Sequence, residues 1–297
     1  SSSPCGSTRK TAVWPWASIA RPPQIGGIAA LSTADSVLMP LTGQSWRLTV
    51  AVYAAVALLA VVLWLLLARD PERYSGKSPG PATAGLYSIQ PFVLLLRMRV
   101  VQIVLLISMG TFLFTHGLNN WLPEILRAGG MTPTQAGFWA AIPTVVGIAG
   151  TLTIARLATP ARRIPILIIL FLSTAVGIVL LATSSGIPLV FGLLLQGIAR
   201  GGVMPVAILI LMDTPQIGSR NMGAAAGLYF TAGEIGGVLG PTLIGVMADL
   251  SGGFFSGLLM VAGVCVVLVF LTIALGMVLR RQAQRDGVGD QCGLRAG

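Results

Sequence analysis

The sequence predicts an all-α, polytopic transmembrane helix bundle, and three observations carry this prediction. The chain has 297 residues, of which 55% are hydrophobic and only 9% are charged. Soluble domains carry about a quarter charged residues, so this composition indicates a membrane protein. Apolar runs of about 20 residues, enough to cross a ~30 Å hydrocarbon core, follow one another along the chain. The basic residues gather in alternate connections between these runs, as the positive-inside rule expects.

Seven apolar runs are each long enough to span the membrane as a helix. An eighth candidate, 24–43, is weaker because it has fewer strong hydrophobes and contains Asp35. Residues 1–23 lack the apolar core of a secretory signal, and we expect an irregular segment there. The seven predicted spans are 47–68, 100–118, 134–155, 164–183, 187–212, 222–248 and 253–279.

Charge orients these spans. The positive-inside rule places the more basic set of connections on the cytoplasmic side, with the tail 281–297, in what we expect is a bacterial inner (plasma) membrane. The connection 69–99 is rich in Pro, Gly, Ser and charge, so we expect a flexible cytoplasmic linker. The other side holds only Arg47 and Arg127. The basic side holds Arg69, Arg73, Lys77, Arg97, Arg99, Arg156, Arg162, Arg163, Arg220, Arg280, Arg281, Arg285 and Arg295.

An internal repeat with an offset of 210 residues links the two ends of the chain. QIGGI at 24–28 matches EIGGV at 234–238, and each motif leads to a short loop and a long apolar helix ending in basic residues. Parallel repeats of membrane helices are one of the symmetries on which transporters are built. The repeat makes 24–68 the last two helices of one unit and 100–280 a complete unit of six. We therefore expect an N-terminally truncated first unit that lacks four helices.

Three motifs and this topology together resemble a known family. The motif GxxxGP occurs at 236–241, a basic loop IARLATPARR at 154–163, and NNWLPEIL at 119–126. The repeat implies two groups of six helices joined by a linker, of which this chain holds the second group and the last two helices of the first. That arrangement resembles the major facilitator superfamily of secondary transporters over about residues 24–280. The stretch 119–126 is similar to the cyanate- and nitroimidazole-permease-like branch. The resemblance implies a complete C-terminal six-helix half plus about two helices of the N-terminal half, coupling to an ion gradient, and no cofactor.

Two departures from the family pattern limit what the resemblance implies. The loop 154–163 lacks the acidic residue and glycines of the usual loop motif, which weakens any gating role. The segment 24–32 lacks the Gly-Pro pair associated with antiporters, so exchange is not inferred.

Arg200 is the principal candidate for solute binding. It lies near the centre of the run 187–212, and Gln196 lies one turn earlier on the same helix face. A guanidinium keeps its charge and suits a carboxylate or another anion. Two alternatives remain open: a structural ion pair with Glu234, or snorkelling of Arg200 toward the cytoplasm.

Glu234 has two alternative roles, proton coupling and helix packing. A carboxylate in mid-span is costly and often functional. The repeat, however, places the non-titrating Gln24 at the matching position, which favours a packing hydrogen bond. The nearby Gly236, Gly240 and Pro241 form a helix-packing motif, because glycines four apart let helices approach closely.

His116, Asn119 and Asn120 form a second candidate cluster. Their i, i+3 and i+4 spacing places them on one helix face. Histidine switches charge near neutral pH, so a solute contact at a cavity mouth is one interpretation. The other is a solvated polar cluster at the outer interface.

Enzyme signatures are absent from the sequence. It contains neither a zinc-protease HExxH, a GxSxG nor a phosphate-binding GxxxxGK[ST], and its single His and three scattered Cys provide little for a metal site. The basic residues form no nucleic-acid-binding patch, so we expect the bilayer and a small solute as partners. The function predicted is secondary transport of a small organic solute, anionic or neutral, by alternating access. The alternatives are a transport-inactive fragment or a half-transporter that acts only as a dimer; the oligomeric state is left open.

Overall fold

The computed structural model describes residues 33, 37–43, 45–67, 89–182 and 186–293 of the chain. The predictions for 1–23, most of 24–43 and most of the linker 69–99 lie outside these residues. The chain divides into two compact units, 1–88 and 89–297, which are described separately.

The prediction of an all-α membrane protein is confirmed, since the described residues contain helices and no strands. Seven helices there are long and apolar enough to cross a membrane. One, α4, lies in the first unit and six lie in the second. Their bounds are α4 Trp46–Leu67, α6 Arg99–Ala128, α7 Pro133–Leu157, α8 Arg163–Leu181, α9 Gly186–Asp213, α10 Gly218–Ser251 and α11 Phe255–Gly293.

In the first unit, the short helix α3 (Met39–Leu41) precedes α4. Gly43 has a φ of 63°, a left-handed conformation that glycine adopts without a steric penalty. The hydroxyls of Thr42 and Thr49 lie 3.0 Å apart and tie this turn to the first turns of α4.

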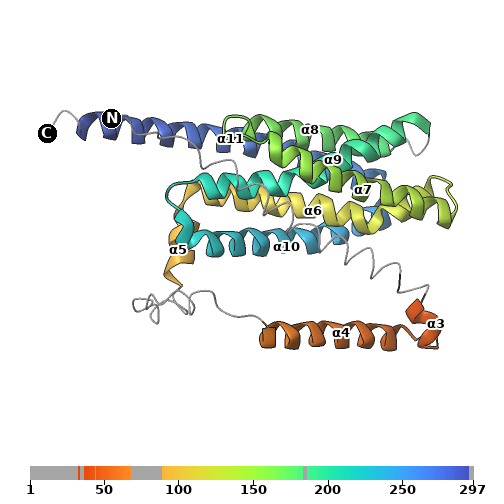
Figure 1. Ribbon diagram of the computed structural model, residues 1–297. Coiled ribbons are helices and arrows are strands. Elements are labelled where there is room, and N and C mark those ends of the chain that lie inside the picture. Colours follow the sequence, from red (N-terminus) through yellow and green to blue (C-terminus); the bar gives the residue numbers. More distant parts are fainter. Residues whose placement is uncertain (1–32, 34–36, 44, 68–88, 183–185, 294–297) are drawn as a thin grey trace. The chain divides into compact units, whose positions relative to one another are not determined.

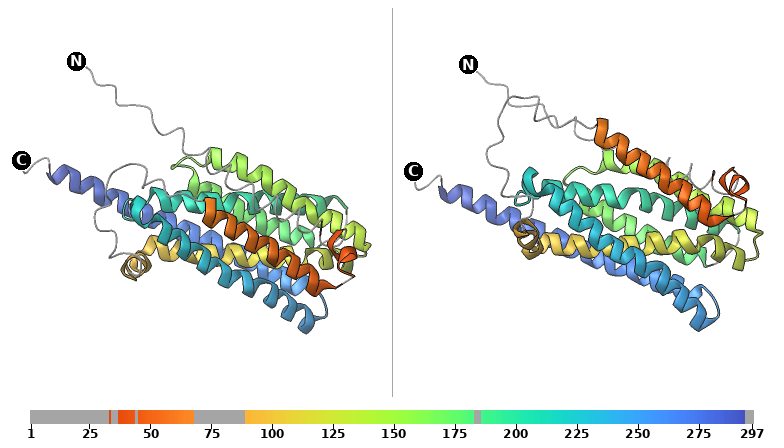
Figure 2. Two further views of the ribbon diagram at one scale, coloured as in Figure 1. Left: turned by 60° about the horizontal axis from the view of Figure 1, so that its bottom comes forward. Right: turned by 90° about the horizontal axis from the view of Figure 1, so that it is seen from below.

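The second unit begins with α5 (Gln90–Arg97), a short helix inside the range predicted as a linker. Pro91 is tolerated in its first turn, where its missing N–H leaves no helical bond unmade. Leu95 is fully buried, and the helix ends at Arg97 because the backbone of Met98 is extended. Figures 1 and 2 show α5 running across the direction of α6 at one end of the bundle. Helix α5 is therefore anchored to the bundle through the buried side chain of Leu95.

The six long helices of the second unit run up and down in alternation (Figure 1). The start of α6 and the end of α11 lie at the same end, which we call the basic end. The most extensively packed pairs are α6 with α10, α7 with α9, α8 with α9, and α11 with both α6 and α8. The helix ends there carry Arg97, Arg99, Arg156, Arg162, Arg163, Arg280 and Arg281.

Glycines allow α6 and α10 to pack backbone against backbone. A Cβ atom on Gly236 would overlap the carbonyl oxygen of Met109, and one on Gly240 would overlap that of Leu113. Two interhelical hydrogen bonds flank this contact: Ser108 Oγ donates to the Tyr229 carbonyl (2.7 Å), and Trp121 Nε1 donates to the Pro241 carbonyl (2.8 Å). The interface therefore depends on the absence of side chains at 236 and 240.

Glycines also allow α7 and α9 to pack backbone against backbone. A Cβ atom on Gly201 would overlap the carbonyl oxygen of Gly147, and one on Gly197 would lie 2.8 Å from the Pro143 carbonyl oxygen. The Thr151 hydroxyl lies within hydrogen-bond distance of two carbonyls, Gly147 of its own helix (2.9 Å) and Gly201 of α9 (3.0 Å). Close packing of this kind fixes the rotation of α9 and so the direction in which its polar side chains project.

Candidate functional site

Gln196 of α9 is a polar group inside the helix bundle. Its side chain is fully buried (0% exposed). Neither its amide nitrogen nor its amide oxygen has a hydrogen-bond partner among the described residues. A buried amide without partners is unfavourable by about 1–3 kcal/mol, so proteins rarely retain one without a functional reason.

Along its helix, Gln196 lies between residues that belong to two different apolar clusters. On α9, Leu189 and Leu193 belong to the smaller cluster, and Ala199 and Val203 belong to the larger one. The same change occurs on α8, where Ile178 packs in the larger cluster and Leu181 in the smaller. On α7, the segment 143–150, whose backbone packs against α9, lies between residues of the two clusters. The amide therefore interrupts the apolar face that α9 buries in the bundle.

Arg200 lies one helical turn from Gln196 and is half-buried. In the part of the chain that the structure describes, its guanidinium makes neither a hydrogen bond nor an ion pair. Glu234 is exposed on α10 and does not pair with it. The alternative of a structural Arg200–Glu234 ion pair is therefore not found. A guanidinium held at mid-span without a counter-ion among the described residues is available to an anion.

A second group of predicted residues meets at the α6–α10 interface. A Cβ atom on Gly237 would lie 3.1 Å from His116 Nδ1 and 3.3 Å from Glu234 Oε2, so this glycine leaves the space between the two side chains open. His116 also stacks on Phe112, with ring centroids 5.5 Å apart. The two titratable groups are neighbours but do not form an ion pair.

Asn119 and Asn120 follow on the exposed side of α6. Asn120 Nδ2 donates to the backbone carbonyl of His116 at 2.9 Å, a bond within one turn of the helix. No hydrogen bond or ion pair between described residues joins this α6–α10 group to Gln196 or Arg200. The predicted site residues therefore form two groups, one on α9 and one on α6 and α10.

Two further residues at these groups were not predicted from the sequence. Gly237 lies within the GxxxGP motif, but it faces His116 rather than a backbone. Thr151 joins α7 to the glycine face of α9 beside Arg200. Its only signal in the sequence is a hydroxyl within an apolar run. Within the described residues there is no group of three or more His, Cys, Asp or Glu side chains that could hold a metal ion.

Replacing Gln196 by leucine is expected to leave thermal stability unchanged or to raise it, because the unpartnered amide is removed and its volume is kept. Thermal unfolding in detergent measures this effect. Thr174→Val is the control, since the buried Thr174 hydroxyl donates to the Leu170 carbonyl (2.9 Å). Its loss is expected to lower stability by about 0.5–1.5 kcal/mol. A clear loss of stability in Q196L would mean that Gln196 makes a hydrogen bond in the folded protein.

Comparison with known proteins supplies the family. A sequence profile of the Major Facilitator Superfamily matches residues 104–293. Two proteins of Agrobacterium vitis named "Putative tartrate transporter" are 28% and 27% identical, over 83% and 80% of this chain. The "Probable galactarate/D-glucarate transporter GudP" of Bacillus subtilis is 25% identical over 80% of this chain.

The coverage of these relatives differs. The chain spans 58% and 55% of the two Agrobacterium proteins and 59% of the Bacillus protein. It spans 98% of an uncharacterized protein of Archaeoglobus fulgidus, with 26% identity over 75% of this chain. The family and the names of the transporter relatives support the prediction that the chain is not an enzyme. With more than half of its residues matched by the family profile, the chain belongs to the Major Facilitator Superfamily.

Proposed function

We propose that the chain serves secondary transport of small organic anions with carboxylate groups, through alternating access. The observation that carries this proposal is Arg200, a half-buried guanidinium at mid-span without a protein counter-ion among the described residues. Arginine remains charged at any physiological pH, and its planar fork matches the two oxygens of a carboxylate. A carboxylate solute would supply the negative charge that the described residues do not.

Gln196 complements this contact. Its amide carries two donors and one acceptor oxygen, none of them bonded to a described residue. A solute that carries hydroxyl groups beside its carboxylate would bond to both ends of the amide. The names of the curated relatives agree with such a solute, because tartrate, galactarate and D-glucarate all combine carboxylates with hydroxyls. We therefore propose hydroxylated dicarboxylates as the solute class.

Glu234 and His116 are the proposed groups for ion coupling. Glu234 forms no hydrogen bond with any described residue, which disfavours the packing alternative for its carboxylate. It lies instead beside a second titratable group across Gly237. A carboxylate and an imidazole that face one opening suit the uptake and release of a proton. Asn119 and Asn120 remain predicted contacts at the outer mouth.

Uptake by proteoliposomes tests the proposal. The purified chain, reconstituted in liposomes with an inward proton gradient, is expected to accumulate radiolabelled tartrate in a saturable manner. Unlabelled galactarate should compete, and the uncharged polyol threitol should not. Absence of flux for every organic acid tested would favour the transport-inactive alternative, and flux of threitol equal to that of tartrate would contradict anion selectivity.

A second candidate, transport by a pair of chains, is favoured by one observation. The Archaeoglobus relative is covered almost entirely by this chain, so a protein of similar extent exists as a separate unit. Chemical cross-linking of the active preparation distinguishes the two possibilities. Activity that co-elutes with a cross-linked dimer supports pairing, and activity of a strictly monomeric species excludes it. Membership of the cyanate- and nitroimidazole-permease-like branch stays a prediction.

A further inference from the structure

A pocket of about 380 Å³ lies at the basic end of the second unit, between α8, α9 and α11. It is separate from the residues proposed to bind solute and to couple ions. Its wall combines apolar side chains with one buried cation, its counter-ion and several amide or hydroxyl groups. The lining residues on which the inference depends are Arg163, Ile164, Asp213, Gln216, Leu279 and Gln282.

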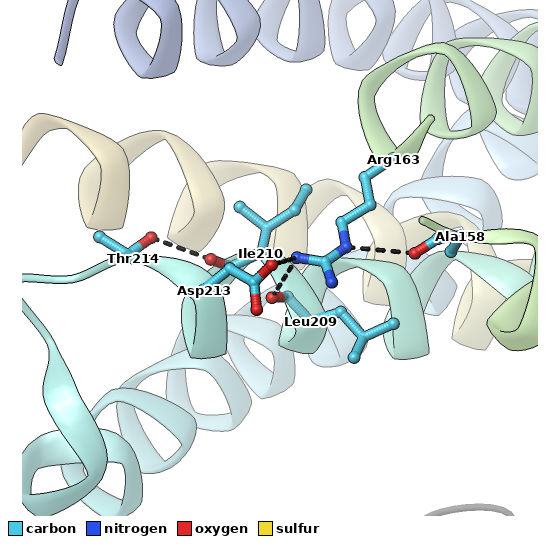
Figure 3. A network of polar contacts seen from close by, with 6 residues as sticks. All are labelled: Ala158, Arg163, Leu209, Ile210, Asp213 and Thr214. Atoms are coloured by element: carbon cyan, nitrogen blue, oxygen red, sulfur yellow. Dashed lines mark hydrogen bonds and ion pairs between the residues drawn. The ribbon is translucent and has the colours of Figure 1, made fainter. Parts of the chain in front are cut away.

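Arg163 is the fixed cation of this pocket (Figure 3). Its side chain is 10% exposed and forms an ion pair with Asp213 at 2.6 Å. Nη1 also donates to the Leu209 carbonyl (2.8 Å), and Nε donates to the Ala158 carbonyl (3.3 Å). Within the described residues, no hydrogen bond or ion pair involves the remaining nitrogen, Nη2. The guanidinium is therefore held rigidly while one of its donor nitrogens stays available.

Positive charge surrounds the pocket. Arg162 precedes Arg163, and Arg280 and Arg281 lie between the lining residues Leu279 and Gln282; all three are exposed. Asp213 is the acidic residue that lines the pocket, and Arg163 already neutralises it. Helix α8 begins at Arg163, so the positive end of its dipole also faces this region. The local field therefore favours an anion.

The pocket adjoins the apolar outer surface of the bundle. Ile169 and Leu172 of α8 and Ile273 and Met277 of α11 are 41–61% exposed on the two helices that border it. Such exposed apolar side chains on membrane-spanning helices face lipid tails. A ligand with a phosphate head and acyl chains would place its head in the pocket and its chains along this surface.

We propose that this pocket binds the phosphate-bearing headgroup of an anionic phospholipid from the leaflet at the basic end. Arg163 Nη2 donates to a phosphate oxygen, Gln216 and Gln282 bond to the glycerol or headgroup hydroxyls, and the outer arginines supply the field. Basic pockets between transmembrane helices are recognised sites for anionic headgroups. The bound lipid would contact the ends of α8, α9 and α11 and so hold them together.

Lipid retention by the purified full chain tests this site. In native mass spectrometry from detergent, wild-type protein is expected to retain phosphatidylglycerol at least tenfold more strongly than phosphatidylcholine. Phosphatidylglycerol should also raise the midpoint of thermal unfolding. Soluble glycerol 3-phosphate at millimolar concentration should not, because it lacks the chains that hold it at the surface.

Three variants locate the binding. Gln282→Trp fills the mouth and leaves the ion pair intact, and the double variant R163Q/D213N removes the cation together with its counter-ion. Both are expected to lose most of the preference for phosphatidylglycerol. Arg156→Gln, which removes an exposed charge at the same end but outside the pocket, should retain it.

Three results would overturn the site. They are equal retention of the two lipids, an equal loss in R156Q and Q282W, or stabilisation by glycerol 3-phosphate that matches the lipid. Unfolding midpoints without lipid show whether Q282W keeps its fold. If it does not, the comparison of R163Q/D213N with R156Q decides.

Discussion

Gly236→Ala is expected to destabilise the bundle and to lower the yield of folded protein, although alanine is the better helix former. The added Cβ atom would overlap the carbonyl oxygen of Met109 and would lie 2.7 Å from the carbonyl carbon of Met109. Both atoms belong to the backbone of α6, so no side-chain rotation relieves the overlap, and the helices must separate. Overpacking of this kind costs about 1–3 kcal/mol. The midpoint of thermal unfolding in detergent measures the loss.

Gly227→Ala on the same helix is the matched control. A Cβ atom there meets nothing within 4 Å. Because alanine replaces glycine in a helix interior, the control is expected to be neutral or to stabilise by up to about 1 kcal/mol. Equal midpoints for the two variants would contradict the backbone contact between α6 and α10.

Arg200→Gln is expected to abolish concentrative uptake of organic acids or to raise the KM at least tenfold. A hydrogen bond to a charged group contributes about 1.5–3 kcal/mol, and 1.4 kcal/mol corresponds to a factor of ten in affinity. Arg200→Lys keeps the charge but loses the planar fork, so an intermediate KM is expected. Initial rates of uptake over a range of solute concentrations provide these values.

Arg127→Gln controls for the loss of one positive charge. Arg127 is exposed at the end of α6 and pairs with Glu124 at 2.8 Å, three residues earlier in the same helix. Exposed pairs of this kind contribute little, so uptake should be unchanged. An Arg200→Gln protein with wild-type KM and rate would remove Arg200 from the solute site.

The membrane helices could be predicted because hydropathy and charge change together at their ends. Helices α6 and α8 begin at Arg99 and Arg163, one residue before the predicted starts, because arginine marks the edge of the apolar core. The end of α6 was placed too early. The helix continues through Pro123 to Ala128, and the Trp121–Pro241 hydrogen bond holds the start of this extension to α10. Hydropathy marks only the apolar part of a helix, so it does not show where a helix continues into the membrane–water interface. It also missed α5, because that helix is too short to span the membrane.

The candidate site was less predictable, because it depends on the rotation of each helix about its axis. The spacing of glycines on α10 predicts close packing, but it does not separate Gly236, which meets a backbone, from Gly227, which meets nothing. The same limit applies to Arg200 and Glu234. Their positions in the sequence permit an ion pair, whereas the packing of α6 against α10 sets Glu234 beside His116 instead. Rotations of this kind follow from contacts between distant segments.

The most direct test of the proposed role of Arg200 is a binding titration, which does not require transport. Tartrate is titrated into wild-type protein and into Arg200→Gln by isothermal calorimetry in detergent at constant pH. We predict saturable binding by the wild type and at least tenfold weaker binding by the variant. Threitol should bind to neither protein. Equal tartrate affinity in the two proteins would contradict the proposal that Arg200 binds the solute.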